Sequence, residues 1–299
     1  MIISSMTSIY GKQRGSDELI TTVESIRRHH ALGFRVLDLS LNPLMRNEGE
    51  FAKDDWKEQA LALKAEAERL GITFYQAHLP FRSRLFPHED AAEVQKLLDM
   101  TMRAVEIAGI EHVKWAVVHP IEDIHAPAEC YSEHILANHE FYAPVIKRAK
   151  ELGVGIAFEN VPSFTTKRRF GGTADELIAL IDSYDSPLVG ACWDFGHANL
   201  VYGDLQSYGI RRLGKRIKAL HFADNYGSRD DHLPPFVGNI KWEDVMSALA
   251  EIEYDGCLVL ETVVNNNLPD ALKDKSMRYL IEISQYLNEL FETQKESRL

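Results

Sequence analysis

The chain has 299 residues, of which 45% are hydrophobic and 26% charged, a balance typical of a folded globular protein that buries a large core. Its 45 acidic and 33 basic residues give a net charge of −12, which weighs against a nucleic-acid partner because DNA binding needs a concentrated positive surface. No apolar run approaches the ~18 residues of a membrane span, and the N-terminus does not resemble a secretion signal, so we expect a cytoplasmic protein with no membrane partner.

Eight short apolar runs, many of them β-branched, are each followed by a stretch with helical periodicity. In chain order the runs cover residues 2–6, 35–41, 72–78, 113–119, 154–159, 188–194, 217–222 and 257–261. Strands that alternate with helices in this way predict βα units and a parallel sheet.

Several of the predicted helices carry their own start or stop signals. Glycine is expected to end three of them: residues 55–70 at Gly71, residues 91–108 at Gly109, and a helix ending near Leu152 at Gly153. Thr173 and Glu176 have the spacing of a capping box, which predicts a helix start. The last helix, about 270–293, places one apolar stripe toward the core: Met277, Leu280, Ile281, Leu287 and Phe291.

The alternation runs through the whole chain without a Gly/Ser-rich linker. Eight strands and eight helices in strict alternation predict one α/β domain over residues 1–299, a (β/α)8 TIM barrel to about residue 262 followed by a C-terminal helix. A doubly wound open sheet is the alternative. It usually carries a GxGxxG loop after its first strand, where this chain has TSIYGKQRGS, so the barrel is favoured.

Side chains able to bind a metal end six consecutive predicted strands. They are His78, His119, Glu159, Asp194, His221 and Glu261. Because catalytic groups of a TIM barrel come from the C-terminal strand ends, we expect these six to converge at one mouth. Each alone has an ordinary structural explanation, such as a hydrogen-bonded histidine, but several carboxylates converging in a buried site need a cation.

Four of these residues supply three carboxylates and one imidazole: Glu159, Asp194, His221 and Glu261. Oxygen-rich sites favour Mn²⁺ or Mg²⁺, whereas added histidines move the preference toward Zn²⁺. A divalent metal ion is therefore the predicted cofactor, with Mn²⁺, Zn²⁺ and Mg²⁺ as candidates.

Five segments carry a resemblance to a known family. They are FENVPSF (158–164), CWDFGHANL (192–200), LHFADN (220–225), DDHLPPFVGNIKW (230–242) and LVLET (258–262). These segments resemble the xylose isomerase-like TIM-barrel superfamily, which includes sugar phosphate isomerase/epimerase proteins and the endonuclease IV apurinic-site nucleases. The resemblance spans residues 72–262 and is weaker over the first two strands.

The two branches of this superfamily imply overlapping sites. In the epimerase-like branch Glu159, Asp194, His221 and Glu261 would hold the metal, Glu159 and Glu261 would also be the acid/base pair, and His197 would help bind substrate. The nuclease branch implies three zinc ions held by nine residues, and all nine positions are ligand-competent here: His78, His119, Glu159, Asp194, His197, His221, Asp230, His232 and Glu261. The metal ligands alone do not separate the branches.

Departures from the nuclease pattern favour the sugar enzymes. DNA-penetrating loops are not evident, and DDHLPP follows His221 at a shorter spacing than in the nucleases. The run is closer to the isomerase-like proteins, although these often read PGEG where this chain has PFVG at 235–238 and therefore lacks their glutamate. Loop cations that follow the strands could hold a substrate phosphate or carboxylate, or could be ordinary solvated charges: Arg82, Arg84, Lys167, Arg168, Arg169 and Arg229. Of these, Arg229 is our substrate-binding candidate.

The leading hypothesis is a divalent-metal-dependent isomerase or epimerase of a small sugar or sugar phosphate. Glu159 and Glu261 would transfer the proton through a metal-stabilised enediolate. One alternative is an endonuclease IV-like tri-metal apurinic-site phosphodiesterase, and another is a sugar or cyclitol dehydratase. A binding protein that has lost catalysis is a further alternative, against which the intact glutamate pair argues. A homo-oligomer is left open.

Overall fold

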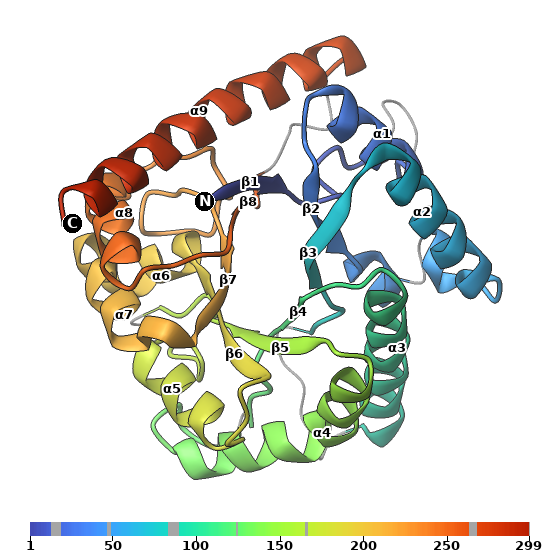
Figure 1. The fold of residues 1–299 in the computed structure, drawn as a ribbon. Helices are drawn as coiled ribbons and strands as arrows, with labels where there is room; N and C mark the ends of the chain where they lie inside the picture. The colour runs from blue at the N-terminus through green and yellow to red at the C-terminus, as the bar shows by residue number, and fades with distance from the viewer. Residues whose placement is uncertain are drawn as a thin grey trace.

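Eight parallel strands form the centre of the protein in a computed structural model that describes residues 1–12, 19–46, 49–82, 90–123, 125–164, 167–262 and 268–298. The strands are β1 (Ile2–Ser5), β2 (Val36–Ser40), β3 (Thr73–His78), β4 (Trp115–Val118), β5 (Gly155–Glu159), β6 (Val189–Asp194), β7 (Ile217–His221) and β8 (Cys257–Leu260). Strands β2 to β7 pair in chain order, and β1 pairs with β8. Two bridges, Met6 with Asp38 and Phe222 with Leu260, join these two sheets. The strands therefore form the predicted TIM barrel, seen as a ring in Figure 1.

Helices surround the strands on the outside of the ring (Figure 1). They are α1 (Thr22–Ala31), α2 (Trp56–Leu70), α3 (Ala91–Ile110), α4 (Tyr131–Glu151), α5 (Ala174–Asp182), α6 (Phe195–Tyr202), α7 (Gln206–Leu213), α8 (Trp242–Glu251) and α9 (Asp270–Glu296). The prediction of strict one-to-one alternation is wrong between β6 and β7, where two helices occur. Asp194 caps α6 directly at the end of β6, and Gly203, at φ +50°, ends it before α7 begins. Among the described helices, none is long and apolar enough to cross a membrane.

Most of the predicted helix signals are confirmed. The Thr173–Glu176 capping box opens α5, and Gly71, at φ +65°, ends α2. Four of the five predicted stripe residues of α9 are buried, and Ile281 is partly buried against the same core.

Gly109 is the exception, because α3 continues past it to Ile110. A Cβ atom at this position would lie 2.9 to 3.1 Å from side-chain atoms of Leu152. The glycine therefore allows the two βα units to pack closely, and it does not stop the helix.

Two clusters of apolar side chains pack inside the barrel below the mouth. Trp115, Val117, Ala157, Cys192 and Ala219 form one inner cluster, and Met6, Cys257 and Val259 form another. Gly155 leaves room for the Trp115 ring, since a Cβ atom there would lie 2.3 Å from a ring carbon. The polar side chains at the strand ends above these clusters are therefore gathered at the C-terminal mouth.

Candidate functional site

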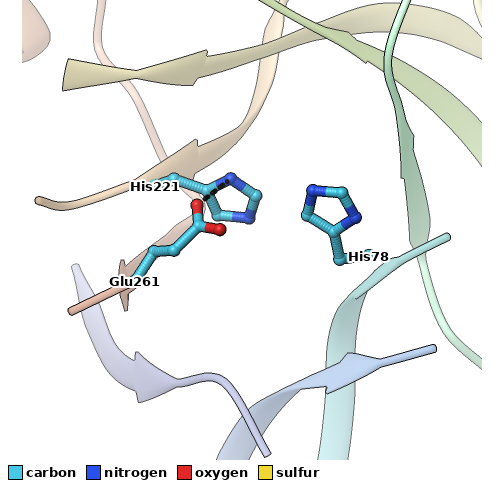
Figure 2. Close-up of side chains that lie close together, drawn as sticks. All are labelled: His78, His221 and Glu261. Carbon is cyan, nitrogen blue, oxygen red and sulfur yellow. Dashed lines mark ion pairs between the residues drawn. The ribbon is translucent and has the colours of Figure 1, made fainter. Parts of the chain in front are cut away.

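Carboxylate and imidazole groups from four neighbouring strands meet at the barrel mouth. Glu159, Asp194, His221 and Glu261 each offer one ligand atom, and these atoms all lie within 4.8 Å of one another. His221 Nδ1 is 2.9 Å from Glu159 Oε1 and 2.7 Å from Glu261 Oε2. Figure 2 shows the contact between His221 and Glu261, with His78 on the opposite side. We call these four residues the inner group.

Glu159 also connects this group to two further histidines. Its Oε2 atom lies 3.1 Å from His78 Nε2 and 3.1 Å from His119 Nε2. The imidazoles of His78 and His221 are parallel, with ring centroids 5.4 Å apart. One carboxylate at the end of β5 therefore faces imidazoles on both of its oxygens.

His197, Asp230 and His232 form an outer group beside the inner one. Asp230 Oδ2 lies 3.2 Å from Nε2 of both histidines. His197 Nδ1 is 3.6 Å from Asp194 Oδ1, so the outer group adjoins the inner group. The structure thus brings together all nine residues singled out in the sequence as ligand-competent.

His197 lies in the first turn of α6, directly after the end of β6. Asp194 is the N-cap of this helix, and its side chain accepts from the backbone N–H of His197 at 2.6 Å. The ring Nδ1–H of His197 donates to the carbonyl of Asn160 at 2.7 Å, which leaves Nε2 directed at Asp230.

Asn160 is a positioning residue that sequence reasoning missed. Its side chain donates to the carbonyl of Asp194 at 2.9 Å and accepts from the backbone N–H of Asp194 at 2.7 Å. Both bonds are buried and join the end of β5 to the end of β6. The FEN sequence at 158–160 contained this amide next to a ligand candidate, which is the signal that could have identified it.

Asp224 orders the segment that carries Asp230 and His232. Its carboxylate accepts from four donors: the backbone N–H groups of Asn225 (2.8 Å), Phe236 (2.9 Å) and Ile240 (3.3 Å), and Nε1 of Trp242 (2.9 Å). A Cβ atom at Gly238 would lie 2.1 Å from Asp224 Oδ1, so only glycine fits there. His232 Nδ1 contacts the carbonyl of Glu261 at 2.8 Å, which anchors the segment beside the inner group.

In the inner group, the pKa shifts favour ionised glutamates beside a protonated imidazole, whose positive charge lies where that of a bound cation would lie. Burial alone would raise the pKa of Glu159, but His221 and His119 hold it well below its usual range. His221 likewise lowers the pKa of Glu261 to about 2 against the effect of burial. Burial would lower the pKa of His221, but its neighbours, Glu261 and Glu159 among them, raise it well above its usual value.

The outer group has the same character. Against the effect of burial, Asp194 and Asp230 raise the pKa of His197 to about 10, and Asp230 and Glu261 raise that of His232 to about 11. In the inner group, burial, together with Glu261 and Glu159, raises the pKa of Asp194 to about 7, although His197 opposes the shift. Metal ions compete with protons for such ligands, so a cation would displace these protons.

The residues present fit a divalent cation. Asp194 Oδ2 and Asp230 Oδ1 are buried and accept no hydrogen bond. Buried carboxylate oxygens are costly to leave without a partner. Carboxylates with imidazoles are the donors that Mn²⁺ and Zn²⁺ take. Cys192 is fully buried, and its Sγ atom lies within 4.8 Å of ligand atoms of Glu159 and His221.

Arg229 is not brought to this cluster. Its side chain is 80% exposed and pairs with Asp231 at 2.7 Å. Other predicted loop cations also pair with carboxylates: Arg82 with Glu93, Arg168 with Glu176 and Arg169 with Glu122. Lys167 is exposed, and Arg84 lies outside the described residues.

Comparison with known proteins identifies the family. The family described as "Xylose isomerase-like TIM barrel" matches residues 26–283. An uncharacterised protein of Methanocaldococcus jannaschii is 32% identical over 214 residues, which is 71% of this chain and 70% of that protein. A D-psicose 3-epimerase of Enterocloster bolteae is 24% identical over 249 residues, 78% of this chain and 74% of that protein. The solved structure of a D-tagatose 3-epimerase-like protein is 26% identical, covers 97% of this chain and 99% of its own, and has a TM-score of 0.71. The chain belongs to the xylose isomerase-like TIM-barrel family.

Proposed function

We propose that the protein is a divalent-metal-dependent sugar isomerase or epimerase, with a ketose 3-epimerase as the first activity to test. The observation that carries the proposal is the approach of Glu159 and Glu261, from different strands, to the same nitrogen of His221. Similarity to a D-psicose 3-epimerase and to a D-tagatose 3-epimerase-like protein supports a sugar substrate.

In this proposal Glu159, Asp194, His221 and Glu261 hold the cation. When bound, the cation supplies Lewis-acid polarisation of neighbouring carbonyl and hydroxyl oxygens of the sugar. One glutamate removes the proton from a sugar carbon, and the other returns a proton to that carbon or its neighbour. His197, held through Asn160, lies beside the pair and donates a hydrogen bond to a substrate oxygen or binds a second cation.

The outer group and the two histidines on Glu159 could hold further cations. His197, Asp230 and His232 place two imidazoles and one carboxylate together, and His78, His119 and Glu159 do the same. Such imidazole-rich sets suit Zn²⁺ better than Mg²⁺. We therefore propose between one and three bound cations, with the inner group occupied first.

The arrangement in three groups also supports the second candidate, a tri-metal phosphodiesterase that acts on abasic DNA. The net charge of −12 argues against it, because a duplex needs many cationic contacts. In the described part of the chain, Arg82, Arg168, Arg169 and Arg229 pair with carboxylates. Because these four arginines already pair with carboxylates, we favour an unphosphorylated sugar over a sugar phosphate as the substrate.

The test is an NMR screen of ketoses in D₂O with protein reconstituted with Mn²⁺ or Zn²⁺, run beside a nicking assay on an abasic duplex at low salt. We expect a new epimer or isomer, or solvent deuterium at a sugar carbon, and no nicking. Nicking of the duplex without turnover or deuterium exchange in any sugar would reverse the two candidates.

A further inference from the structure

A buried carboxylate outside the nine residues lies beneath the inner group. Asp38 is in the middle of β2, within the apolar run VLDLS, and its side chain has no solvent exposure. Its Oδ2 atom accepts from Gln76 Nε2 at 2.7 Å and lies 3.4 Å from His221 Nε2. Burying a carboxylate in a barrel interior costs free energy unless hydrogen-bond donors face its oxygens.

The two ring nitrogens of His221 face different carboxylates. Nδ1 faces Glu159 and Glu261 in the inner group, whereas Nε2 faces Asp38 across the barrel. An imidazole that binds a cation through Nδ1 must carry its proton on Nε2. The Asp38 carboxylate is an acceptor for that proton. The Cys192 thiol also borders this site, but a thiol is only a weak acceptor.

Gln76 in turn fixes the Asp38 carboxylate. It lies on β3 two residues before His78, and its Nε2 atom donates to Asp38 and approaches the carbonyl of Leu220 at 3.4 Å. Leu220 directly precedes His221 on β7. The amide therefore connects β2, β3 and β7 immediately below the inner group.

We propose that Asp38 is a positioning residue that holds His221 in the orientation and tautomer required for metal binding, with Gln76 holding Asp38. The inference rests on the proposed metal centre and adds a contact behind it. Asp38 lies on the side of the imidazole away from the glutamates, so it acts through His221. Replacing a carboxylate that accepts a hydrogen bond from a metal-ligating histidine typically weakens metal binding by about 10- to 100-fold.

The test compares Asp38→Asn with the wild-type protein and with Ser4→Ala. Ser4 is a buried residue on the adjacent strand β1 whose hydroxyl has no hydrogen-bond partner, so its removal is a matched control. The Kd for Zn²⁺ and for Mn²⁺ is measured by competition with a fluorescent chelator, without reference to turnover. We expect Asp38→Asn to weaken binding about 10- to 100-fold and Ser4→Ala to leave it unchanged.

A second readout separates positioning from general stability. In the Zn²⁺-loaded protein, ¹⁵N NMR of the histidine rings should show a protonated Nε2 for His221, and Asp38→Asn should broaden or shift that signal.

If Asp38→Asn does not fold, the same measurements are made on Gln76→Met, for which a smaller fall in affinity is expected. Unchanged Kd values in the variant that folds would overturn the inference. A wild-type protein that binds no cation would overturn both the inference and the proposed function, whereas metal binding without sugar turnover would overturn only the latter.

Discussion

Asp194 Oδ1 accepts a 2.6 Å hydrogen bond from the backbone N–H of His197, so the residue that ends β6 also caps α6. This bond occupies one oxygen of the carboxylate and leaves Oδ2 buried without a donor. Asn160 fixes the same residue from β5. The inner and outer groups are therefore joined through a single turn, and we expect them to respond together to changes there.

Metal binding should raise the melting temperature of the protein. A cation that binds only the folded state at about 100 times its Kd stabilises that state by about 2.7 kcal/mol. We expect chelation of protein reconstituted with Mn²⁺ or Zn²⁺ to lower the melting temperature by several degrees, and elemental analysis to give at least one equivalent. Less than one equivalent after reconstitution would contradict the metal assignment.

Replacing either proposed acid/base residue should abolish turnover without unfolding the barrel. Glu159→Gln and Glu261→Gln each remove a proton-transfer group, which costs on the order of 10²-fold or more. Initial rates on the ketose found in the screen, with circular dichroism of each variant, check this. Glu106→Gln is the control, because Glu106 lies on α3 and pairs with Arg148. Near-normal rates in both site variants would refute the assignment.

Much of the fold could be predicted because its signals are local. The period of the apolar residues marks each strand, and the strand-end position of Glu159 or His221 is visible in the sequence itself. The capping box at Thr173 needs only four residues to form. Closure of the barrel then follows from the repetition of one unit.

The features that were missed depend on contacts between distant segments. Gly109 reads as a helix stop, but its role comes from Leu152, which belongs to the next βα unit. Asp38 reads as one polar residue inside an apolar strand. Its contact with His221 exists only because the closed barrel brings β2 opposite β7. No periodicity within a single strand encodes such a contact.

Loss of the Asp224 carboxylate should loosen the outer group more than the inner one. Asp224→Asn leaves one acceptor oxygen for four donors, and hydrogen bonds to charged groups are worth about 1.5–3 kcal/mol each. We expect a loss of about 2 kcal/mol or more in the free energy of unfolding, together with fewer bound Zn²⁺ equivalents. Urea unfolding and elemental analysis measure the two effects.

Asp231→Asn is the matched control in the same segment. Asp231 pairs with the exposed Arg229, and surface ion pairs contribute little. We expect this variant to keep wild-type stability and metal content. Equal metal loss in both variants would show that the segment tolerates no change at all and would remove the special role of Asp224.

His29 should make the protein less stable as the pH falls below 6.5. Its ring is fully buried on α1, and Nδ1–H donates to the carbonyl of Ser25 at 2.8 Å. A second proton on Nε2 would have no acceptor. Burial therefore lowers the pKa of His29 from 6.5 to about 4, although the bond to Ser25 opposes the shift.

The sign of the effect follows from proton uptake. Between pH 6.5 and 4 the unfolded chain binds a proton at His29 that the folded protein does not, so the free energy of unfolding decreases as the pH is lowered through this window. At pH 5 the loss is about 2 kcal/mol relative to pH 7.

His29→Leu removes this contribution and should lose less stability than the wild type between pH 7 and pH 5. Urea unfolding of both proteins in EDTA, with Ser25→Ala as a control that retains the imidazole, measures the difference. Parallel pH profiles for the wild type and His29→Leu would show that the buried ring takes up its proton in the folded state as readily as in the unfolded chain.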